Sequence, residues 1–320
     1  MSHYLEFEKP LEELQMRLQE LQRLGGPEEE LQALRQELLG LRQRLYSNLS
    51  PWQKCLVARH PERPQCLQYI SLLGEDFLEL HGDRRYGDDP AVIGGLMSLE
   101  GQTVMVLGQQ KGRTLKERLA RNFGQPHPEG YRKALRLMRL AERFGKPVIT
   151  LVDTPGAYPG VGAEERGQAE AIATNLQEMS RLRVPIVSVI IGEGGSGGAL
   201  ALAVADRLYM MEHAVFSVIS PEGCAAILWR RPEQPVGQKE FAQAAQNLKL
   251  TAQELKGFGL IDGIIAEPPG GAHADPEAAA QALKGALLQA LRELKDKPHQ
   301  ELLRQRYEKL RAIRGFATEG

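Results

Sequence analysis

The sequence has few of the features that mark secreted, membrane or nucleic-acid-binding proteins. Its 320 residues include only three cysteines, Cys55, Cys66 and Cys224, without a Cys-x-x-Cys pair, so neither a disulfide framework nor a four-cysteine zinc site is predicted. The formal net charge of −1 gives no general attraction to nucleic acid or to an anionic membrane. No apolar run reaches the roughly 20 residues of a membrane-spanning helix. The acidic start MSHYLEFEKP lacks the character of a signal or transit peptide. We therefore expect a folded cytoplasmic protein that binds neither membrane nor nucleic acid.

A leucine pattern near the start of the chain predicts two helices. Over residues 10–49 the leucines alternate in steps of three and four, which is heptad spacing. Gly25, Gly26 and Pro27 interrupt the pattern, so we expect a helical hairpin at residues 1–49, followed by a main domain at residues 50–320. The leucine seam needs a cover, and both the main body and a partner subunit are open alternatives.

From residue 91 onward, strand-like and helix-like segments alternate. Apolar runs rich in β-branched residues predict strands, and amphipathic runs between them predict helices. Such alternation is typical of an α/β fold with right-handed crossovers. We expect strands at residues 92–99, 103–108, 148–152 and 186–191, helices at 129–144 and 163–181, and C-terminal helices at 275–316 that cover the core or a partner.

An internal repeat links two of these strands. The segment KPVITLVDTPGAYPG, which begins at Lys146, aligns with VPIVSVIIGEGGSGG from Val184 at an offset of 38 residues. Each copy is a strand that starts after a proline and ends in a glycine turn before a helix. The repeat predicts β-turn-helix units stacked in a spiral, with a third round from residue 207 and Ser220 as the N-cap of its helix.

The most informative segment is the glycine run at residues 192–198, which has five glycines in seven residues between a strand and a small-residue helix. Backbone N–H groups exposed at such a junction favour an anion. The plainest alternative is that glycine merely permits close packing of helix on strand. Three chemistries fit the pattern: a dinucleotide fingerprint at Gly192, Gly194 and Gly197, a nucleophile elbow around Ser196, and an oxyanion hole made by the N–H groups of Gly197 and Gly198.

The first two chemistries are disfavoured by the place of the glycine run in the chain and by the residues that a serine nucleophile would need. A dinucleotide fingerprint normally marks the first strand-to-helix turn of a domain, whereas this run has a sister turn upstream, although Glu212 lies at a suitable distance for a ribose hydroxyl. A serine hydrolase would combine Ser196 with Asp262 and His273. His273, however, lies in the segment PGGAHADP, whose composition predicts a flexible loop, whereas a general base must be held within hydrogen-bond distance of its serine.

An oxyanion hole needs no side chain at the turn. Adjacent N–H groups at the start of a helix can hold a developing enolate, and small residues are required because a Cβ atom would push the substrate away. The sister turn at Gly156 and Ala157 would add a second set of donors to the same or a neighbouring cavity.

Several long, ungapped segments carry a resemblance to a known family: PEGYRKALRLMRLAERFGKPVITLVDTPGAYPGVGAEERGQAEAIA at 128–173, IGEGGSGGALAL at 191–202, SVISPEGCAAILW at 217–229, LVARHPERP at 56–64, GDRRYGDD at 82–89 and GGAH at 270–273. They resemble the alpha subunit of bacterial acetyl-CoA carboxylase carboxyltransferase over nearly the whole chain. The resemblance implies a crotonase-like spiral of ββα units, here with an N-terminal helical hairpin and C-terminal helices. That fold agrees with the 38-residue repeat.

The resemblance also implies an activity, the transfer of CO2 from carboxybiotin on a separate protein to acetyl-CoA, giving malonyl-CoA for fatty acid synthesis. In this family the alpha subunit faces the biotin and the beta subunit binds most of the CoA, so the active site lies between subunits. Gly197 and Gly198 would hold the ureido oxygen of biotin as it becomes enolate-like, and the biotin anion would take a proton from the acetyl methyl group. The competing hypotheses are a serine hydrolase using Ser196 and a non-catalytic binding subunit.

Further site residues are candidates on the same grounds. The sister turn either shapes the biotin cavity with an aromatic wall or is a plain turn. Two basic residues in GQQKGR either meet a CoA phosphate or a carboxylate, or form a solvated helix start. The candidates on the carboxybiotin side are Gly156, Ala157, Tyr158, Gly194, Gly195 and Ser196, and those for CoA or a carboxylate are Lys111 and Arg113.

The sequence lacks the motifs that would belong to the other components of such an enzyme, as expected for one of its subunits. Three cysteines cannot build the four-cysteine zinc ribbon of the family's beta subunit, so we expect no metal in this chain. Neither the MKM biotinylation motif nor the ATP-binding G-x-x-x-x-G-K-[ST] motif is present. The implied partners are a zinc-ribbon beta subunit in a complex of two alpha and two beta subunits, a biotin carboxyl carrier protein, biotin carboxylase and acetyl-CoA. Residues 230–253 depart most from the family pattern, and their role is open.

Overall fold

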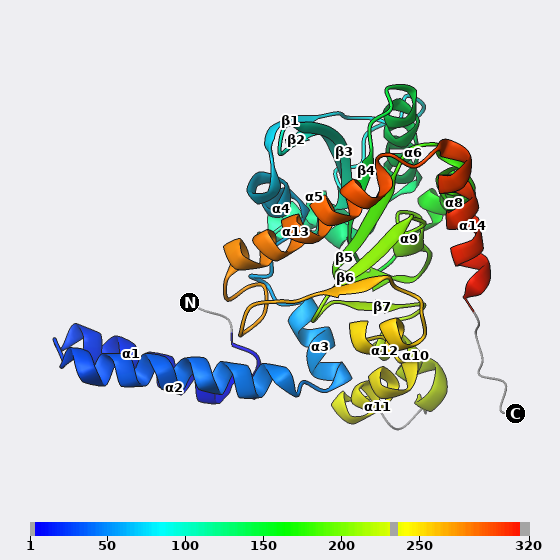
Figure 1. Ribbon diagram of the computed structural model, residues 1–320. Helices are drawn as coiled ribbons and strands as arrows, with labels where there is room; N and C mark the ends of the chain where they lie inside the picture. Colours follow the sequence, from blue (N-terminus) through cyan, green and yellow to red (C-terminus); the bar gives the residue numbers. More distant parts are fainter. Residues whose placement is uncertain (1–3, 231–235, 314–320) are drawn as a thin grey trace, which may run out of the picture.

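The computed structural model describes residues 4–230 and 236–313. This part of the chain folds around one mixed sheet of eight strands (Figure 1). The strands are β1 (Glu75–Glu79), β2 (Val92–Leu99), β3 (Gln102–Gln109), β4 (Val148–Thr154), β5 (Ile186–Gly195), β6 (Arg207–Met211), β7 (Val215–Ser217) and β8 (Gly263–Ile265). Their spatial order is β1-β2-β3-β4-β5-β6-β8, with β7 paired to β5. The first two pairings are antiparallel and all the others are parallel.

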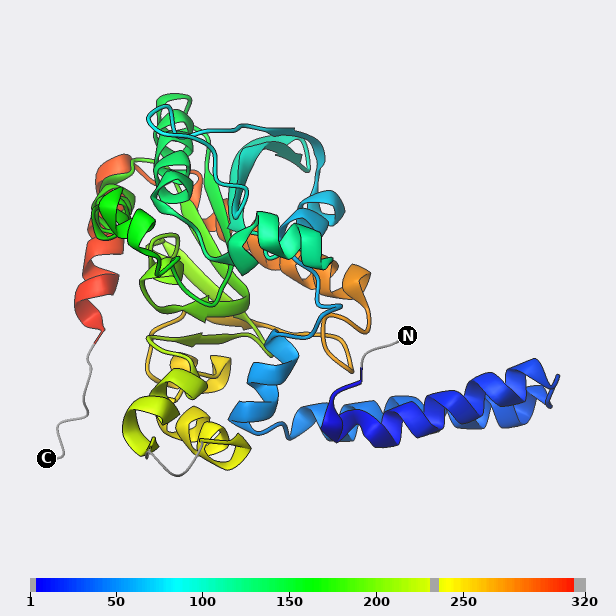
Figure 2. The ribbon, with the colours of Figure 1, turned by 180° about the vertical axis from the view of Figure 1, so that it is seen from behind.

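Helices surround this sheet (Figures 1 and 2). They are α3 (Pro51–Ala58), α4 (Cys66–Leu73), α5 (Leu115–Ala120), α6 (Pro128–Arg143), α7 (Val161–Glu165), α8 (Gln168–Arg181), α9 (Ser196–Leu200), α10 (Pro221–Trp229), α11 (Gln238–Leu248), α12 (Ala252–Gly257), α13 (Pro276–Leu294) and α14 (His299–Ala312). Helix α6 packs against β2 and β3, α13 packs against α4, β5 and β8, and α14 packs against α8. Within residues 4–230 and 236–313, no helix is long and apolar enough to cross a membrane.

The 38-residue repeat is the pairing register of β4 and β5. Val148 lies opposite Ile186 and Thr150 opposite Ser188, both at the offset seen in the sequence. The hydroxyl of Thr150 lies 2.7 Å from that of Ser188, and both donate to the carbonyl of Leu202. Equivalent residues of the two copies are therefore neighbours in adjacent parallel strands, which confirms the predicted stacking of repeated units.

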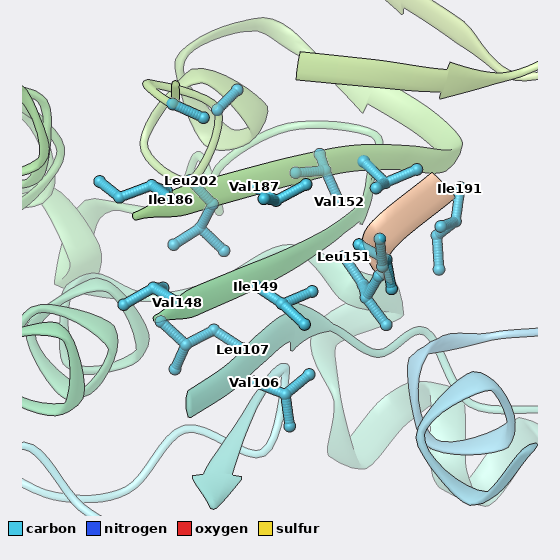
Figure 3. Packing of buried hydrophobic residues seen from close by; sticks show 14 of the residues in the cluster. Val106, Leu107, Val148, Ile149, Leu151, Val152, Ile186, Val187, Ile191 and Leu202 are labelled. Carbon is cyan, nitrogen blue, oxygen red and sulfur yellow. The ribbon is translucent and has the colours of Figure 1, made fainter. Parts of the chain in front are cut away.

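Side chains of β3, β4 and β5 form the centre of the core. Figure 3 shows how they interleave from adjacent strands, together with one residue that follows α9. Close packing of such side chains is the main source of stability in a domain of this size. The residues labelled there are Val106, Leu107, Val148, Ile149, Leu151, Val152, Ile186, Val187, Ile191 and Leu202.

Most of the predicted elements are confirmed, and the differences have local causes. The two expected strands at 92–99 and 103–108 form a hairpin whose turn residues, Glu100 and Gly101, both have positive φ. Ser220 accepts from the N–H of Gly223 at 3.1 Å and caps α10 as expected. The prediction of a single helix at 163–181 was wrong, because Gly167 adopts φ +83° and divides this stretch into α7 and α8. Strand β1 was also missed.

The N-terminal hairpin consists of α1 (Lys9–Arg23) and α2 (Glu28–Ser47), preceded by a short 3-10 segment, η1 (Glu6–Glu8). Figures 1 and 2 both show the two helices side by side and extending away from the body. Their facing leucines are buried against each other, so the seam is covered within the hairpin rather than by the main body as one alternative held. The division of the chain at residues 49 and 50 stays a prediction.

A buried polar cluster fixes the base of this hairpin. The hydroxyl of Tyr46 donates to the Glu8 carboxylate, which also accepts from the N–H of Leu5 at 2.7 Å. His273 Nε2 lies 3.8 Å from Glu8 and 3.4 Å from the Tyr46 hydroxyl. Burial acts to raise the pKa of Glu8, but the hydrogen bonds from His273 and Tyr46 outweigh it and the pKa is lowered. The cluster ties the N-terminal segment to a loop near the other end of the sequence.

Replacing Tyr46 by Phe removes a hydrogen bond to a buried carboxylate. We expect the free energy of unfolding of Tyr46→Phe to fall by about 1.5–3 kcal/mol, measured by urea denaturation at neutral pH. Tyr307→Phe is the matched control, because the Tyr307 side chain is exposed on α14. Equal midpoints for the two variants would contradict a structural role of the Glu8 cluster.

Candidate functional site

The glycine run lies at the carboxyl end of β5. The sequence predicted that the strand ends at Ile191, and this was wrong, because β5 continues to Gly195. Its last three residues pair with β7, which places Glu193 opposite Val215 and Gly195 opposite Ser217. Only then does the chain reverse into α9, through Ser196 at φ +53°. The run is therefore half strand and half helix start rather than one turn.

Glycine is required at two positions of this run by the sister turn. A Cβ atom on Gly195 would overlap the carbonyl of Pro155, and one on Gly198 would lie 2.5 Å from the backbone nitrogen of Ala157. Both contacts are with backbone, which cannot move aside as a flexible side chain can. The two turns of the repeat thus meet backbone to backbone, and the hypothesis of close packing explains these two glycines.

Gly197 is different. A Cβ atom there would meet only Ile172, at an ordinary 3.8 Å. Gly197 is half-buried and lines a largely apolar pocket of about 440 Å³, whose wall also includes Leu200, Phe216 and Ile313. Packing within the chain therefore gives no reason for glycine at this position, whereas a ligand that approaches the backbone from the pocket does.

The backbone around the site is held by a buried amide side chain. Gln109 Nε2 donates to the carbonyl of Gly198 at 3.0 Å, and its Oε1 accepts from the N–H of Asp153 at 3.0 Å. On the sister turn, Thr154 Oγ1 accepts from the N–H of Gly156 at 3.1 Å. The N–H groups of Gly197 and Gly198 belong to the first turn of α9, where no preceding helical carbonyl can accept from them. The site presents fixed donors beside a pocket.

The residues predicted on the sister turn lie next to this region. Gly156, Ala157 and Tyr158 are half-buried. The Tyr158 ring stacks on the His127 ring with ring centroids 4.2 Å apart. The backbone N–H of Tyr158 donates to the carbonyl of Pro126. An aromatic wall beside the turn is therefore present, and its contact with a biotin substrate stays a prediction.

An ion network that the sequence analysis missed surrounds Glu193, which is itself part of the glycine run. Glu193 lies 2.5 Å from Arg59 Nε and 2.8 Å from Lys111 Nζ, and Lys111 Nζ also lies 2.7 Å from Asp153. Burial acts to raise the pKa of Glu193, but the charges of Lys111 and Arg59 outweigh it and lower the pKa to about 2. Glu193 is therefore ionised. The one feature of the sequence that could have predicted this network is Glu193 itself, a charged residue that continues an apolar strand.

Known proteins match this chain over nearly its whole length. The family model described as acetyl co-enzyme A carboxylase carboxyltransferase-like matches residues 4–314. The chain belongs to this family. The acetyl-coenzyme A carboxylase carboxyl transferase subunit alpha of Thermus thermophilus is 55% identical over 318 residues, which cover 98% of this chain and 99% of that one. The subunit of the same name from Geobacter metallireducens is 55% identical over 319 residues, 98% of each chain.

Solved structures confirm the fold of this carboxyltransferase chain. Transcarboxylase 12S superposes with a TM-score of 0.58 at 22% identity, covering 79% of this chain and 43% of that one. The Pseudomonas malonate decarboxylase hetero-dimer gives a TM-score of 0.56 at 19% identity, covering 82% and 96%. The predicted α/β, crotonase-like architecture is thereby confirmed, and the activity class of the chain is carboxyl transfer.

The serine-hydrolase alternative finds no support in the carboxyltransferase family or in the geometry. Asp262 accepts from the N–H of Leu208 at 2.6 Å and pairs with Lys309, while the His273 ring stacks on His60. In the described part of the chain, neither forms a hydrogen bond with Ser196. Glu212, the candidate for a ribose hydroxyl, instead accepts from the N–H of Glu267 at 3.1 Å.

Two further predictions for this carboxyltransferase chain have different outcomes. Lys111 is not part of a solvated helix start, because its amine is held by two carboxylates of its own chain. Arg113, which follows the end of β3, is exposed, and its guanidinium donates to the side chain of Gln68 on α4. The role of either residue toward CoA stays a prediction. The segment 231–235, part of the stretch that departs from the family pattern, lies outside the described residues.

One group of metal-binding residue types exists among the described residues. Glu8, His60 and His273 each offer a ligand atom within 4.8 Å of the others. Both carboxylate oxygens of Glu8 already accept hydrogen bonds, and the N–H of Glu62 donates to His60 Nδ1. The expectation that this chain carries no metal stays a prediction.

Neutralising Glu193 should flatten the acid sensitivity of the protein. Because its folded pKa is about 2 and its ordinary value is 4.5, the ionised form contributes stability above the ordinary value that is lost as pH falls toward 2. We expect Glu193→Gln to lower the free energy of unfolding at pH 7 and to reduce its further loss between about pH 5 and pH 3, relative to wild type. Urea denaturation at pH 7 and across this interval measures the effect.

The control for that experiment is Glu178→Gln, because Glu178 pairs with an exposed arginine, Arg139, on the surface. This variant should keep the pH dependence of the wild type. A Glu193→Gln protein with unchanged stability and an unchanged acid limb would show that the Arg59–Glu193–Lys111 network contributes nothing.

Proposed function

We propose that this chain is the biotin-facing half of a two-subunit acetyl-CoA carboxyltransferase. It would transfer CO2 from carboxybiotin, carried on a separate protein, to acetyl-CoA, giving malonyl-CoA for fatty acid biosynthesis. The observation that carries the proposal is Gly197, which faces a pocket and has no need to be glycine for packing. Curated relatives at 55% identity over nearly the full length carry the name of this subunit, which supports it.

The extent of the structural match supports a divided active site. The chain corresponds to 43% of the longer transcarboxylase chain, and the Pseudomonas malonate decarboxylase is itself a hetero-dimer. Exposed apolar side chains lie around the mouth of the pocket, where Val218 is 79% exposed and Leu200 is 41% exposed. A partner subunit that closes this mouth would exclude water and complete the site.

The catalytic role of the chain follows from its backbone. The N–H groups of Gly197 and Gly198 would hold the ureido oxygen while negative charge develops on it, and one such donor contributes about 3 kcal/mol to transition-state stabilisation. Carboxybiotin supplies both the CO2 and, after losing it, the base for the acetyl methyl proton. Gly156, Ala157 and Tyr158, with Gly194, Gly195 and Ser196, would wall the cavity. No acid or base from this chain is needed, because the substrate provides it.

The remaining partners follow from this division of labour. A beta subunit with a zinc ribbon would bind most of the CoA and stabilise the acetyl enolate, in a complex of two alpha and two beta subunits. Biotin carboxylase would load the biotin on its carrier protein. The cytoplasm is the expected location. The carboxyl acceptor is set by the CoA side of the site, so its identity depends on the partner.

Adding one methyl group at Gly197 tests the oxyanion hole. We expect Gly197→Ala, in complex with the beta subunit, to lower kcat/KM for malonyl-CoA decarboxylation with free biotin by about 100-fold, the typical effect of losing one such donor. Its stability should change by no more than about 0.5 kcal/mol, because the new Cβ meets only Ile172. Activity is measured by coupled assay and stability by urea denaturation.

Two matched glycine variants make that result interpretable. Gly198→Ala should lose stability as well as activity, because its Cβ would strike the backbone of Ala157. Gly285→Ala should lose neither, because a Cβ in the middle of α13 meets nothing within 4 Å. A Gly197→Ala enzyme of full activity would refute the assignment of the hole.

Mixing the subunits tests the shared site. We expect the isolated chain to decarboxylate malonyl-CoA at background rate, and the rate to rise with added beta subunit until the two are equimolar, since each subunit supplies one enolate site. The rate is measured against the ratio of the subunits. Full activity of the isolated chain would contradict a divided active site.

A further inference from the structure

The loop between β1 and β2 uses its acidic side chains internally. Asp83 is buried, and one of its carboxylate oxygens accepts from the N–H groups of Arg85, Tyr86 and Gly87 at 2.8, 2.8 and 3.0 Å. Its other oxygen accepts from Arg132 Nε at 2.8 Å. One carboxylate therefore fixes three successive residues of the loop and anchors them to α6.

The two following acidic residues are also satisfied. Asp88 accepts from Lys133 Nζ at 2.6 Å and from the N–H of Gly82 at 2.7 Å. Asp89 is buried and accepts from the N–H groups of Ala91 and His127 at 2.9 and 2.7 Å. The segment GDRRYGDD contains three acidic and two basic residues, yet all three acidic side chains are already engaged by hydrogen bonds within the fold.

The arginines are left on the outside of the loop. Arg84 donates to the carbonyl of His81 at 2.9 Å, and Arg136 of α6 donates to the carbonyls of Gly82 and His81 at 2.9 and 3.1 Å. Within the described chain, neither these two nor Arg85 forms an ion pair with a carboxylate. Three positive charges thus gather without an ion-pair partner in this part of the structure.

These side chains surround a hollow of about 370 Å³ between the loop, α6 and α8. Five arginines line it against two acidic residues, Asp83 and Glu170, so the wall carries an excess of three positive charges. Asp83 is already engaged, Glu170 on α8 accepts from Thr174, and Arg139 at the rim pairs with Glu178. Burial lowers the pKa of Arg136, and the neighbouring charge of Arg84 lowers it further.

The loop also bears a backbone cost. Arg84 has φ +64°, a left-handed conformation that a side chain disfavours, and its charge acts unfavourably on the neighbouring Arg136. Backbone strain and like-charge repulsion therefore fall in the same short loop, a combination that is found at functional sites. A guanidinium offers paired N–H donors that match phosphate oxygens, which an ammonium does not.

We propose that this hollow binds the diphosphate group of a small organic phosphate. Its volume falls in the usual range for small-molecule sites, and its concave shape favours a compact ligand over an extended polyanion. A free nucleoside diphosphate and CoA, whose own diphosphate and ribose phosphate share this chemistry, are the two sources. The proposal does not depend on the assigned oxyanion hole. Ala171 lines the hollow and packs in one cluster with Ala157 and Ala201, so only α8 separates the two sites.

Titration of the full chain tests the proposal. Pyrophosphate, ADP and CoA are titrated separately by isothermal calorimetry at low and at physiological salt. We expect saturable binding of pyrophosphate that weakens with salt and weakens at least tenfold in Arg85→Gln and in Arg136→Gln. The matched control is Arg183→Gln, because Arg183 is an exposed arginine that pairs with Glu142 and does not line the hollow.

The ligands distinguish the two sources. CoA that binds tighter than ADP and loses affinity in Arg85→Gln would assign the hollow to CoA, and ADP that binds at least as tightly as CoA would assign it to a free nucleotide. Absence of saturable binding at millimolar ligand, or equal affinity in Arg85→Gln and the control, would overturn the proposal. Arg85→Gln is decisive because that side chain makes no described contact, whereas Arg136→Gln also removes donors from the loop. The Gly197→Ala assay reports on carboxyl transfer separately, so either idea can fail alone.

Discussion

The close backbone approach of two turns, at the carboxyl ends of β4 and β5, is the constraint on which the rest of the structure depends. Gly195 and Gly198 leave no room for a side chain against Pro155 and Ala157. Parallel pairing of the two strands brings the turns together, and Gln109 then fixes both from below by binding Asp153 and the carbonyl of Gly198. Backbone donors placed in this way need no reorganisation when charge develops before them.

Charge is distributed unevenly around this rigid centre. At the glycine run, Arg59, Lys111 and Asp153 form a largely buried ion network with Glu193 of the run itself, in which the charges neutralise one another. On the far side of α8, arginines are left without carboxylate partners because the loop has used its own. The chain is nearly neutral overall, so these local imbalances, rather than its net charge, decide which ligands it attracts.

Local sequence was sufficient for elements whose partners lie nearby or whose face is strongly apolar. The hairpin at 92–109, helix α6 and the helical hairpin all satisfy this condition. The end of β5 does not, because Glu193 and its neighbours extend the strand by pairing with β7, more than 20 residues away. The same limit applies to the site: glycines were recognisable from their own pattern, whereas the partners of Glu193 lie at Arg59 and Lys111, in segments that no local window connects.

The irregularity between β4 and β5 has a consequence for the direction of side chains. Val152 pairs with Ile190, but Thr154 pairs with Gly194, so β5 contains two more residues than β4 over this stretch. An insertion of one residue would turn every later side chain to the opposite face of the sheet, whereas two preserve the alternation. The end of β5 therefore advances by up to about 6.6 Å past its neighbour without exchanging its faces. Asp153 accepts the N–H of Glu193 at 2.9 Å, in the stretch where the register slips. A shift of two residues therefore lets β5 extend beyond the equivalent strand of the repeat, while its side chains keep the faces on which the core packs.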